Sequence, residues 1–174
     1  MIRTLEFLLQ PSTLEQKELD SLLKLGNSFY NAIVEYDQFC YSTYKKSPTQ
    51  YEVAREIKTL KDKYDEYKPV HSHLLQGLVK RYYLAKSYAF KLYKKKLNLF
   101  KSGVIPYKPR LCLPKIKESC NTLWFKELGN GCKLIDNNRV RLNQTKIKYR
   151  NHLKTIPGKI KYLGFTKKID KFYL

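Results

Sequence analysis

The stretch TLEFLLQPSTLEQ, Thr4 to Gln16, passes from a strand pattern to a helix pattern and decides the fold class. Apolar side chains alternate with others up to Pro11, which predicts a strand over Arg3–Gln10. Ser12-x-x-Glu15 follows and has the pattern of a capping box, which predicts the start of a helix. Only helical patterns come next, so the strand is expected to pair with strands beyond Thr122.

Four helices are predicted between this strand and residue 102. Gly26 is expected to end the first helix, and a second capping box, Thr49-x-x-Glu52, is expected to start the third. Pro69 separates the third from the fourth, HSHLLQGLVKRYYLAKSYAFKLYKKK. The predicted helices cover about 12–25, 27–44, 49–68 and 71–96.

Short β-rich segments occupy the chain beyond a proline-punctuated linker. The predicted strands lie near 122–125, 132–135, 139–142, 146–149, 159–165 and 171–174. We therefore predict an α+β fold in which a helical lobe, residues 11–102, is inserted into a small antiparallel β-barrel. The barrel is expected to comprise residues 1–10, whose strand closes it, and residues 103–174.

The net charge of +20 is confined to one part of the chain. Residues 1–70 carry 10 Lys and Arg against 11 Asp and Glu, whereas residues 71–174 carry 25 against 4. A generally lysine-rich composition would make both parts basic, so the asymmetry favours a polyanion-binding surface over a merely solvated one.

The fourth predicted helix has one apolar face and one basic, acid-free face. At 100° per residue the apolar face holds Leu74, Leu75, Leu78, Tyr82, Ala85, Ala89, Leu92 and Tyr93. The opposite face holds His73, Gln76, Lys80, Tyr83, Ser87, Lys91 and Lys94. Gln can contact base edges while Lys and Ser contact phosphates, so this face suits nucleic acid. The alternative is a lysine-rich helix with an incidental Gln.

No catalytic or metal-binding pattern is evident. The cysteines Cys40, Cys112, Cys120 and Cys132 form no C-x-x-C pair, which favours buried or idle thiols over a metal site. The four acids after residue 70 are too scattered to propose a two-metal cluster, and His71 and His73 diverge from Ser72 on a helix. We expect a cytoplasmic chain that is not itself an enzyme, with no membrane or small-molecule partner.

Eight segments together resemble the N-terminal portion of TnpB proteins, the OrfB-type insertion-sequence proteins that are RNA-guided DNA endonucleases related to type V CRISPR effectors. They are PSTLEQ (11–16), FYN (29–31), TQYEVAREIKTLK (49–61), HSHLLQGLVKRYYLAKSYAF (71–90), DNNRVRL (136–142), IKYR (147–150), IPGKIK (156–161) and DKFYL (170–174). The resemblance covers essentially the whole chain.

The resemblance implies a helical recognition lobe in a wedge-type β-barrel that holds guide RNA and contacts a target-adjacent motif in double-stranded DNA. The family's RuvC-like nuclease domain, which would use magnesium, would begin after Leu174, so this chain is expected to need no cofactor. Gln76 matches a motif-reading position, while Ser72 stands where the family often has a cation; Gln50 and Tyr51 match the second reading site. The linker GVIPYKPR also departs from the family's tighter form. Basic residues of the linker and of two motifs complete the expected nucleic-acid-binding set: Lys108, Arg110, Lys148, Arg150, Lys159 and Lys161.

Two other functions remain open at the level of sequence. A basic, ribosome-associated type of RNA-binding protein would need only the charged second part. An inactive remnant of a decayed transposon would keep the same residues without a function.

Overall fold

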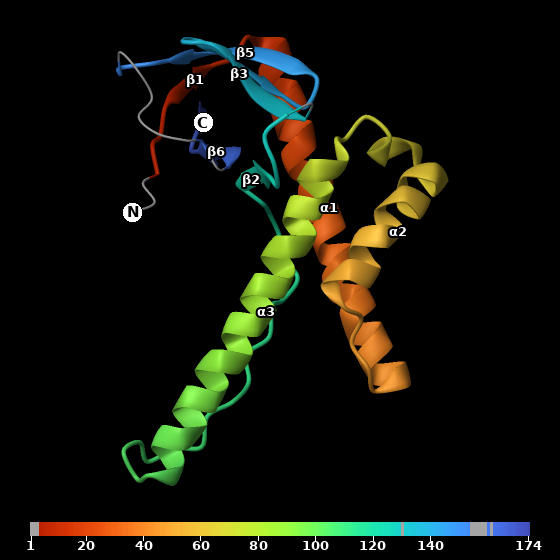
Figure 1. The fold of residues 1–174 in the computed structure, drawn as a ribbon, viewed down its shortest axis with the longest axis vertical. Coiled ribbons are helices and arrows are strands. Elements are labelled where there is room, and N and C mark those ends of the chain that lie inside the picture. The colour runs from red at the N-terminus through yellow and green to blue at the C-terminus, as the bar shows by residue number, and fades with distance from the viewer. Residues whose placement is uncertain (1–3, 130, 154–159, 161) are drawn as a thin grey trace.

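The computed structural model describes residues 4–129, 131–153, 160 and 162–174, and it has a β-sheet at one end from which helices extend as two diverging arms (Figure 1). In this part of the chain there are three α-helices, α1 (Thr13–Tyr44), α2 (Gln50–Lys63) and α3 (Ser72–Lys101), and a 3-10 turn at Asp65–Tyr67. One arm contains the end of α1 with α2 beside it, and the other is the distal half of α3 (Figure 1).

Seven antiparallel strands form a single sheet. They are β1 (Leu8–Gln10), β2 (Thr122–Phe125), β3 (Cys132–Asp136), β4 (Arg139–Leu142), β5 (Thr145–Arg150), β6 (Leu163–Lys168) and β7 (Lys171–Tyr173). Their order is β2-β6-β7-β1-β5-β4-β3. The predicted α+β class is therefore confirmed, and each of the six predicted C-terminal segments overlaps a strand. The 159–165 segment matches least well, because β6 runs from Leu163 to Lys168, and residues 159 and 161 lie outside the described residues.

The N-terminal strand pairs with strands beyond Thr122, as predicted, and joins the two halves of the sheet. It is shorter than the predicted Arg3–Gln10, because only Leu8–Gln10 form a strand, and Arg3 lies outside the described residues. Leu8 is opposite Arg150 of β5 and Tyr173 of β7. Phe7 and Leu174 extend the second ladder by exchanging two backbone hydrogen bonds of 3.2 and 2.8 Å. The helices are thus inserted between β1 and its partners in the chain.

The predicted barrel is not supported, because the sheet is not closed: β2 and β3 are its two edges and do not pair in the described residues. The start of α3 lies beside both edges instead. The Lys126 amide, just after β2, donates to the His73 carbonyl at 3.2 Å. At the other edge, a Cβ added to Gly131, just before β3, would meet the His71 ring. The Asn143 side chain, in the β4–β5 turn, also accepts from the His71 amide at 2.8 Å and donates to the Pro69 carbonyl at 3.0 Å.

The prediction of four helices was wrong because Gly26 does not end a helix. Residues 13–44 form one helix that ends instead at Lys45, whose φ of 53° is left-handed. Gly26 lies where α1 crosses β2, and a Cβ there would be 2.7 Å from Cδ2 of Leu123. Glycine here permits close packing of α1 on the sheet. Both predicted capping boxes are confirmed, with Ser12 and Thr49 at the N-caps of α1 and α2.

A single hydrophobic core connects the sheet to the first half of α3 and to α1. Its largest fully buried side chains include Tyr82, Tyr149, Phe125 and Phe165. The predicted apolar face of α3 is buried at Leu74, Leu75, Leu78 and Tyr82, but Ala85 and Leu92 are exposed because the distal half of α3 leaves the other helices. None of the described helices has the length and apolar character to cross a membrane.

Candidate nucleic-acid interface

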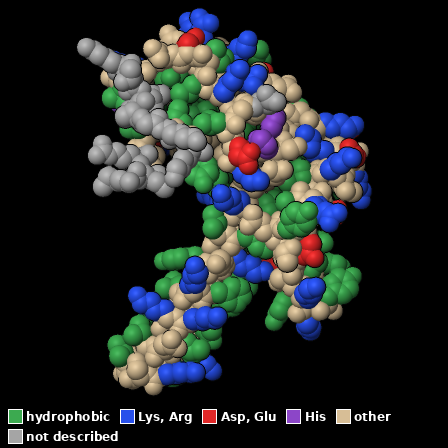
Figure 2. All heavy atoms as spheres, viewed as in Figure 1, with side chains coloured by type: hydrophobic (Ala, Val, Ile, Leu, Met, Phe, Trp, Pro, Cys, Tyr) green, Lys and Arg blue, Asp and Glu red, His purple; other side chains and the backbone are tan. Residues whose placement is uncertain are grey.

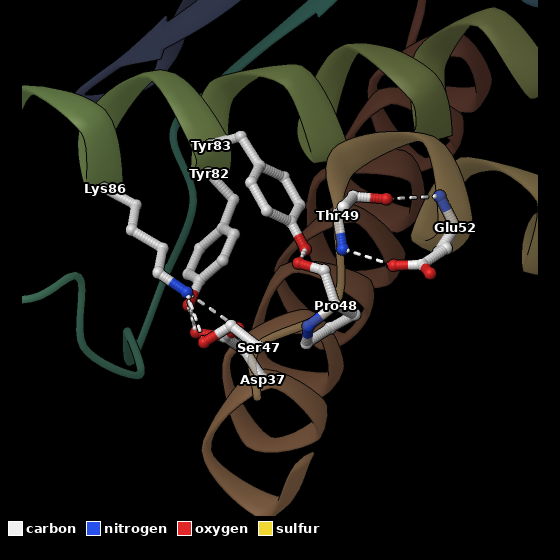
Figure 3. A network of polar contacts seen from close by, with 8 residues as sticks. All are labelled: Asp37, Ser47, Pro48, Thr49, Glu52, Tyr82, Tyr83 and Lys86. Carbon is white, nitrogen blue, oxygen red and sulfur yellow. Dashed lines mark hydrogen bonds and ion pairs between the residues drawn. The ribbon is translucent and has the colours of Figure 1, made fainter. Parts of the chain in front are cut away.

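A buried polar network fixes α3 against α1 (Figure 3). Lys86 on α3 donates to both carboxylate oxygens of Asp37 on α1, at 2.8 and 2.7 Å, and to the Ser47 hydroxyl at 2.9 Å. The Tyr82 hydroxyl donates to the same carboxylate at 2.6 Å. Burial and this hydrogen bond to Asp37 raise the pKa of Tyr82, so it remains a donor. These contacts tie α3 to α1 and to Ser47, the third residue after the end of α1.

Tyr83 fixes the start of α2 on the neighbouring side of α3. Its hydroxyl donates to the Pro48 carbonyl at 2.7 Å, just before the capping box at Thr49 (Figure 3). Burial raises the pKa of Tyr83. This predicted nucleic-acid contact therefore has its hydroxyl engaged within the protein, and its visible role is to position α2.

The sheet packs on α3 through a glycine and an arginine. A Cβ at Gly77 would lie 2.5 Å from the backbone oxygen of Trp124, so only glycine allows β2 to approach this closely. One turn later the Arg81 guanidinium donates to the Thr122 carbonyl at 3.0 Å. These contacts place the outward-facing side chains of β2 beside α3.

Lys80 meets two aromatic rings at this junction. Its ammonium lies 5.9 Å from the centroid of the Trp124 ring and 5.3 Å from that of Tyr162. The two rings are 5.6 Å apart and nearly perpendicular. The Tyr162 side chain is half-exposed, so the surface beside Lys80 offers both a cation and an accessible aromatic ring.

Trp124 and Tyr162 were not predicted as site residues, although a signal for Trp124 was present. Leu123 and Phe125 are buried on one side of β2, so strand alternation places Trp124, the one Trp in the sequence, on the other. No local pattern brings Tyr162 to it, because that contact depends on the β2–β6 ladder.

Gln76 shares one face of α3 with Lys80, which contacts the Trp124 ring, and with Tyr83, which bonds to Pro48. It precedes Lys80 by one turn and Tyr83 by two, so helical geometry places it on the same side of α3 as these two residues. Gln76 is partly exposed, as are Ser72 and His73 before it. Helix geometry therefore places Ser72, His73, Gln76 and Lys80 along one side of α3, and of these Lys80 meets aromatic rings beside β2.

The second arm is long, basic and free of acids. Residues 84–117, the distal half of α3 and the returning linker, contain ten Lys and Arg and no Asp or Glu. Figure 2 shows Lys and Arg side chains along this arm among hydrophobic ones. The predicted residues on it are all exposed: Ser87, Lys91, Lys94, Lys108 and Arg110.

The end of the linker is anchored on α1. The Asn31 side chain donates to the Lys117 carbonyl and accepts from the Lys117 amide, both at 2.9 Å. Asn27 donates to the same carbonyl at 3.0 Å, and the Lys117 ammonium lies 4.7 Å from the centroid of the Tyr30 ring. The linker therefore has a defined path back to β2.

The remaining predicted residues lie elsewhere. Gln50 and Tyr51 are exposed in the first turn of α2, where Arg55 lies over the Tyr51 ring. Lys148 and Arg150 are exposed on β5, which is separated from β2 in the sheet by β1, β7 and β6. Lys159 and Lys161 lie outside the described residues.

Metal-ligand types do not converge in the described part of the chain. No group of three His, Cys, Asp or Glu side chains there could hold a metal ion. All four cysteines are free thiols; Cys112 is exposed, and burial raises the pKa of Cys132 to about 12.

No protein-family model matches the sequence, and no curated protein matches it.

Proposed function

We propose that the chain is a nucleic-acid-binding module of the TnpB type, which holds guide RNA and contacts a target-adjacent motif in double-stranded DNA without cleaving it. In this proposal the helices act as a recognition lobe and the sheet as a wedge-type domain, in a cytoplasmic setting. Magnesium-dependent cleavage belongs to the family's nuclease domain, and the chain itself uses no cofactor.

The observation that carries the proposal is the acid-free segment between Tyr67 and Lys117, folded as α3 and the returning linker. It contains 13 Lys and Arg and no Asp or Glu. A helix surface that is merely solvated gains stability from Glu–Lys pairs spaced four residues apart, and this segment has none. A cationic surface with accessible aromatic rings is what a nucleic-acid backbone and its bases require.

Gln76 is the residue proposed to read the DNA motif. Lys80 and Trp124 on one side and Tyr83 on the other hold the face around it. An amide in such a setting can make two hydrogen bonds to an adenine edge in the major groove. Lys80 and Lys91 are proposed to contact phosphates, which carry no sequence information.

Selection from a pool of randomised duplexes, using purified protein with and without its RNA, tests this assignment. We expect one motif to be enriched, and Gln76→Ala to weaken discrimination at one position by about 1–3 kcal/mol. Lys80→Ala and Lys91→Ala are the matched controls and should lower affinity for all sequences alike. A selection that enriches nothing leaves the ribosome-associated type of RNA binding if the chain still binds structured RNA, and an inactive remnant if it does not.

A further inference from the structure

A second basic feature lies at the opposite end of α3 from the tip of the arm. A cavity of about 520 Å³ opens beside the first residues of α3, between α2 and the β4–β5 hairpin. Its lining includes Lys61, Lys68, His71, Arg141, Asn143 and Lys146. None of the residues lining it is Asp or Glu.

The four cations of this basic cavity come from four separate segments. Lys61 is on α2 and Lys68 follows the 3-10 turn, while Arg141 and Lys146 are on β4 and β5. Because Lys61 and Lys68 are far in sequence from Arg141 and Lys146, only the tertiary fold brings the two pairs of charges to one cavity. Like charges gathered around a hollow repel one another, and an anion between them removes that repulsion.

Two donors of the basic cavity, Lys61 and Lys68, retain capacity for a ligand. The Lys61 ammonium donates to the Val70 carbonyl at 2.8 Å, which uses one of its three protons. Lys68 pairs at 2.6 Å with Asp65, whose side chain is 89% exposed, so solvent screens that pair strongly. Between the lining residues Gln144 and Lys146, the Thr145 hydroxyl donates to the Glu18 carboxylate, which does not itself line the cavity.

The wall of the basic cavity is held rigidly. Asn143 has a left-handed φ of 58°, and its backbone N–H donates to the Gly131 carbonyl at 2.7 Å. Its side chain joins Pro69 and His71 to the hairpin. A site held by such contacts needs little reordering to bind. The positive end of the α3 dipole also points toward this region.

The charges around the basic cavity also act on His71. Burial lowers the pKa of His71, and the charges of His73, Lys61 and Arg141 lower it further. A positive charge added at this point is therefore disfavoured.

We propose that the basic cavity is a phosphate-binding site that takes one phosphate group of a bound RNA. The identity of the polymer rests on the proposed function. The phosphate is either a terminal phosphate or an internal phosphodiester, and both present the same anionic oxygens to Lys61, Lys68 and Lys146.

Titration of the isotope-labelled full chain with inorganic phosphate, monitored by NMR, tests the site itself. We expect phosphate, at matched ionic strength against chloride, to shift the His71 ring and the Asn143 side-chain amide. Lys68→Gln/Lys146→Gln should weaken phosphate binding about tenfold or more, because two charge-assisted contacts are removed. Lys24→Gln/Lys171→Gln removes two exposed charges from α1 and β7 and should leave it within about twofold. Equal losses in both variants, or shifts spread over other lysines, would overturn the proposal.

One RNA oligonucleotide prepared with a 5′-phosphate and with a 5′-hydroxyl separates the two sources. Shifts at His71 and Asn143 with the 5′-phosphate alone indicate a terminal phosphate; shifts with both indicate an internal one. If RNA binds and the His71 and Asn143 signals do not shift, the phosphate-site inference is overturned, while the proposed function still stands. Phosphate shifts at the cavity in a chain that binds no RNA would instead leave a phosphate site and remove the proposed function.

Discussion

Lys86 places its ammonium 2.7 Å from the carboxylate of Asp37 across the α1–α3 contact, and the side chains are only 12% and 6% exposed. Two buried charges cost desolvation energy that only close, well-satisfied contacts offset. Tyr82 and Ser47 supply further hydrogen bonds to this pair. Removing either partner alone would therefore leave the other as an unpaired buried charge.

Lys86→Met should lower the free energy of unfolding by about 3–5 kcal/mol, because Asp37 would remain buried without its counter-ion. Asp37→Asn in the same chain should recover part of the loss, since a neutral amide costs less to bury. Urea denaturation followed by circular dichroism measures both. Lys68→Met, which breaks the exposed pair with Asp65, is the control and should change stability by less than about 1 kcal/mol. Equal effects of the two lysine substitutions would contradict the argument.

Gly77 and Gly26 should differ in their tolerance of alanine. Alanine at Gly77 would meet the rigid Trp124 backbone, whereas alanine at Gly26 would meet the end of the Leu123 side chain. We expect Gly77→Ala to destabilise the protein by about 1–3 kcal/mol or more. Gly26→Ala should be close to neutral, because the higher helix propensity of alanine stabilises α1 by about 1 kcal/mol and Leu123 can change rotamer. Thermal unfolding of the two variants checks the order, and a reversed order would contradict it.

Local sequence signals predicted most elements, and tertiary contacts account for the errors. Capping boxes located the starts of α1 and α2, and alternation located the strands. The expected stop at Gly26 was wrong because a glycine that ends a helix and one that admits a neighbour look alike in sequence. The closed barrel is not supported, because the start of α3 lies beside both edges of the open sheet, and no local sequence pattern indicates these contacts.

The residues of the candidate interface could be predicted from the sequence only where they belong to one helix, α3. Helical periodicity put Gln76 and Lys80 on one face, and they lie together in the structure. The same periodicity grouped Tyr83 with them, but in the structure the Tyr83 hydroxyl donates to the Pro48 carbonyl. Asp37 follows Ile33 and Val34 on the buried side of α1, so its place was visible in the pattern, whereas its pairing with Lys86 was not.

The stability of the protein should fall as the pH drops through the ordinary pKa of histidine. Burial and neighbouring positive charges lower the pKa of His71 in the fold, so below about pH 6.5 the unfolded chain binds this proton more readily. The stabilisation is complete above that pH and is lost below it. His71→Asn keeps an N-cap side chain for α3 but does not titrate. Melting temperatures of both proteins between about pH 7.5 and pH 5 should diverge; parallel curves would exclude His71 as the cause.

Deletion of residues 1–10 should unfold the sheet while sparing helical structure. β1 lies between β5 and β7, so its loss removes two ladders and divides the sheet. The contacts between α1 and α3 through Asp37 do not involve β1. Amide exchange should therefore accelerate in β4–β7 more than around Tyr82. Protection lost first in the helices would mean that the helices depend on the sheet for their stability.

The basic arm should dominate the salt dependence of nucleic-acid binding. Each phosphate contact by a lysine releases condensed counterions and adds about 0.7–0.9 to the slope of log affinity against log salt. Replacing Lys91, Lys94 and Lys95 by Gln should therefore lower the slope by about two to three for a structured RNA, and weaken binding at low salt. The matched control replaces Lys17, Lys24 and Lys58, which are equally exposed on α1 and α2 in the part of the chain without excess charge. Fluorescence anisotropy over a salt series measures both triple variants. If the control lowers the slope as much as the arm variant, the RNA responds to net charge alone, and the acid-free face of α3 is not its binding surface.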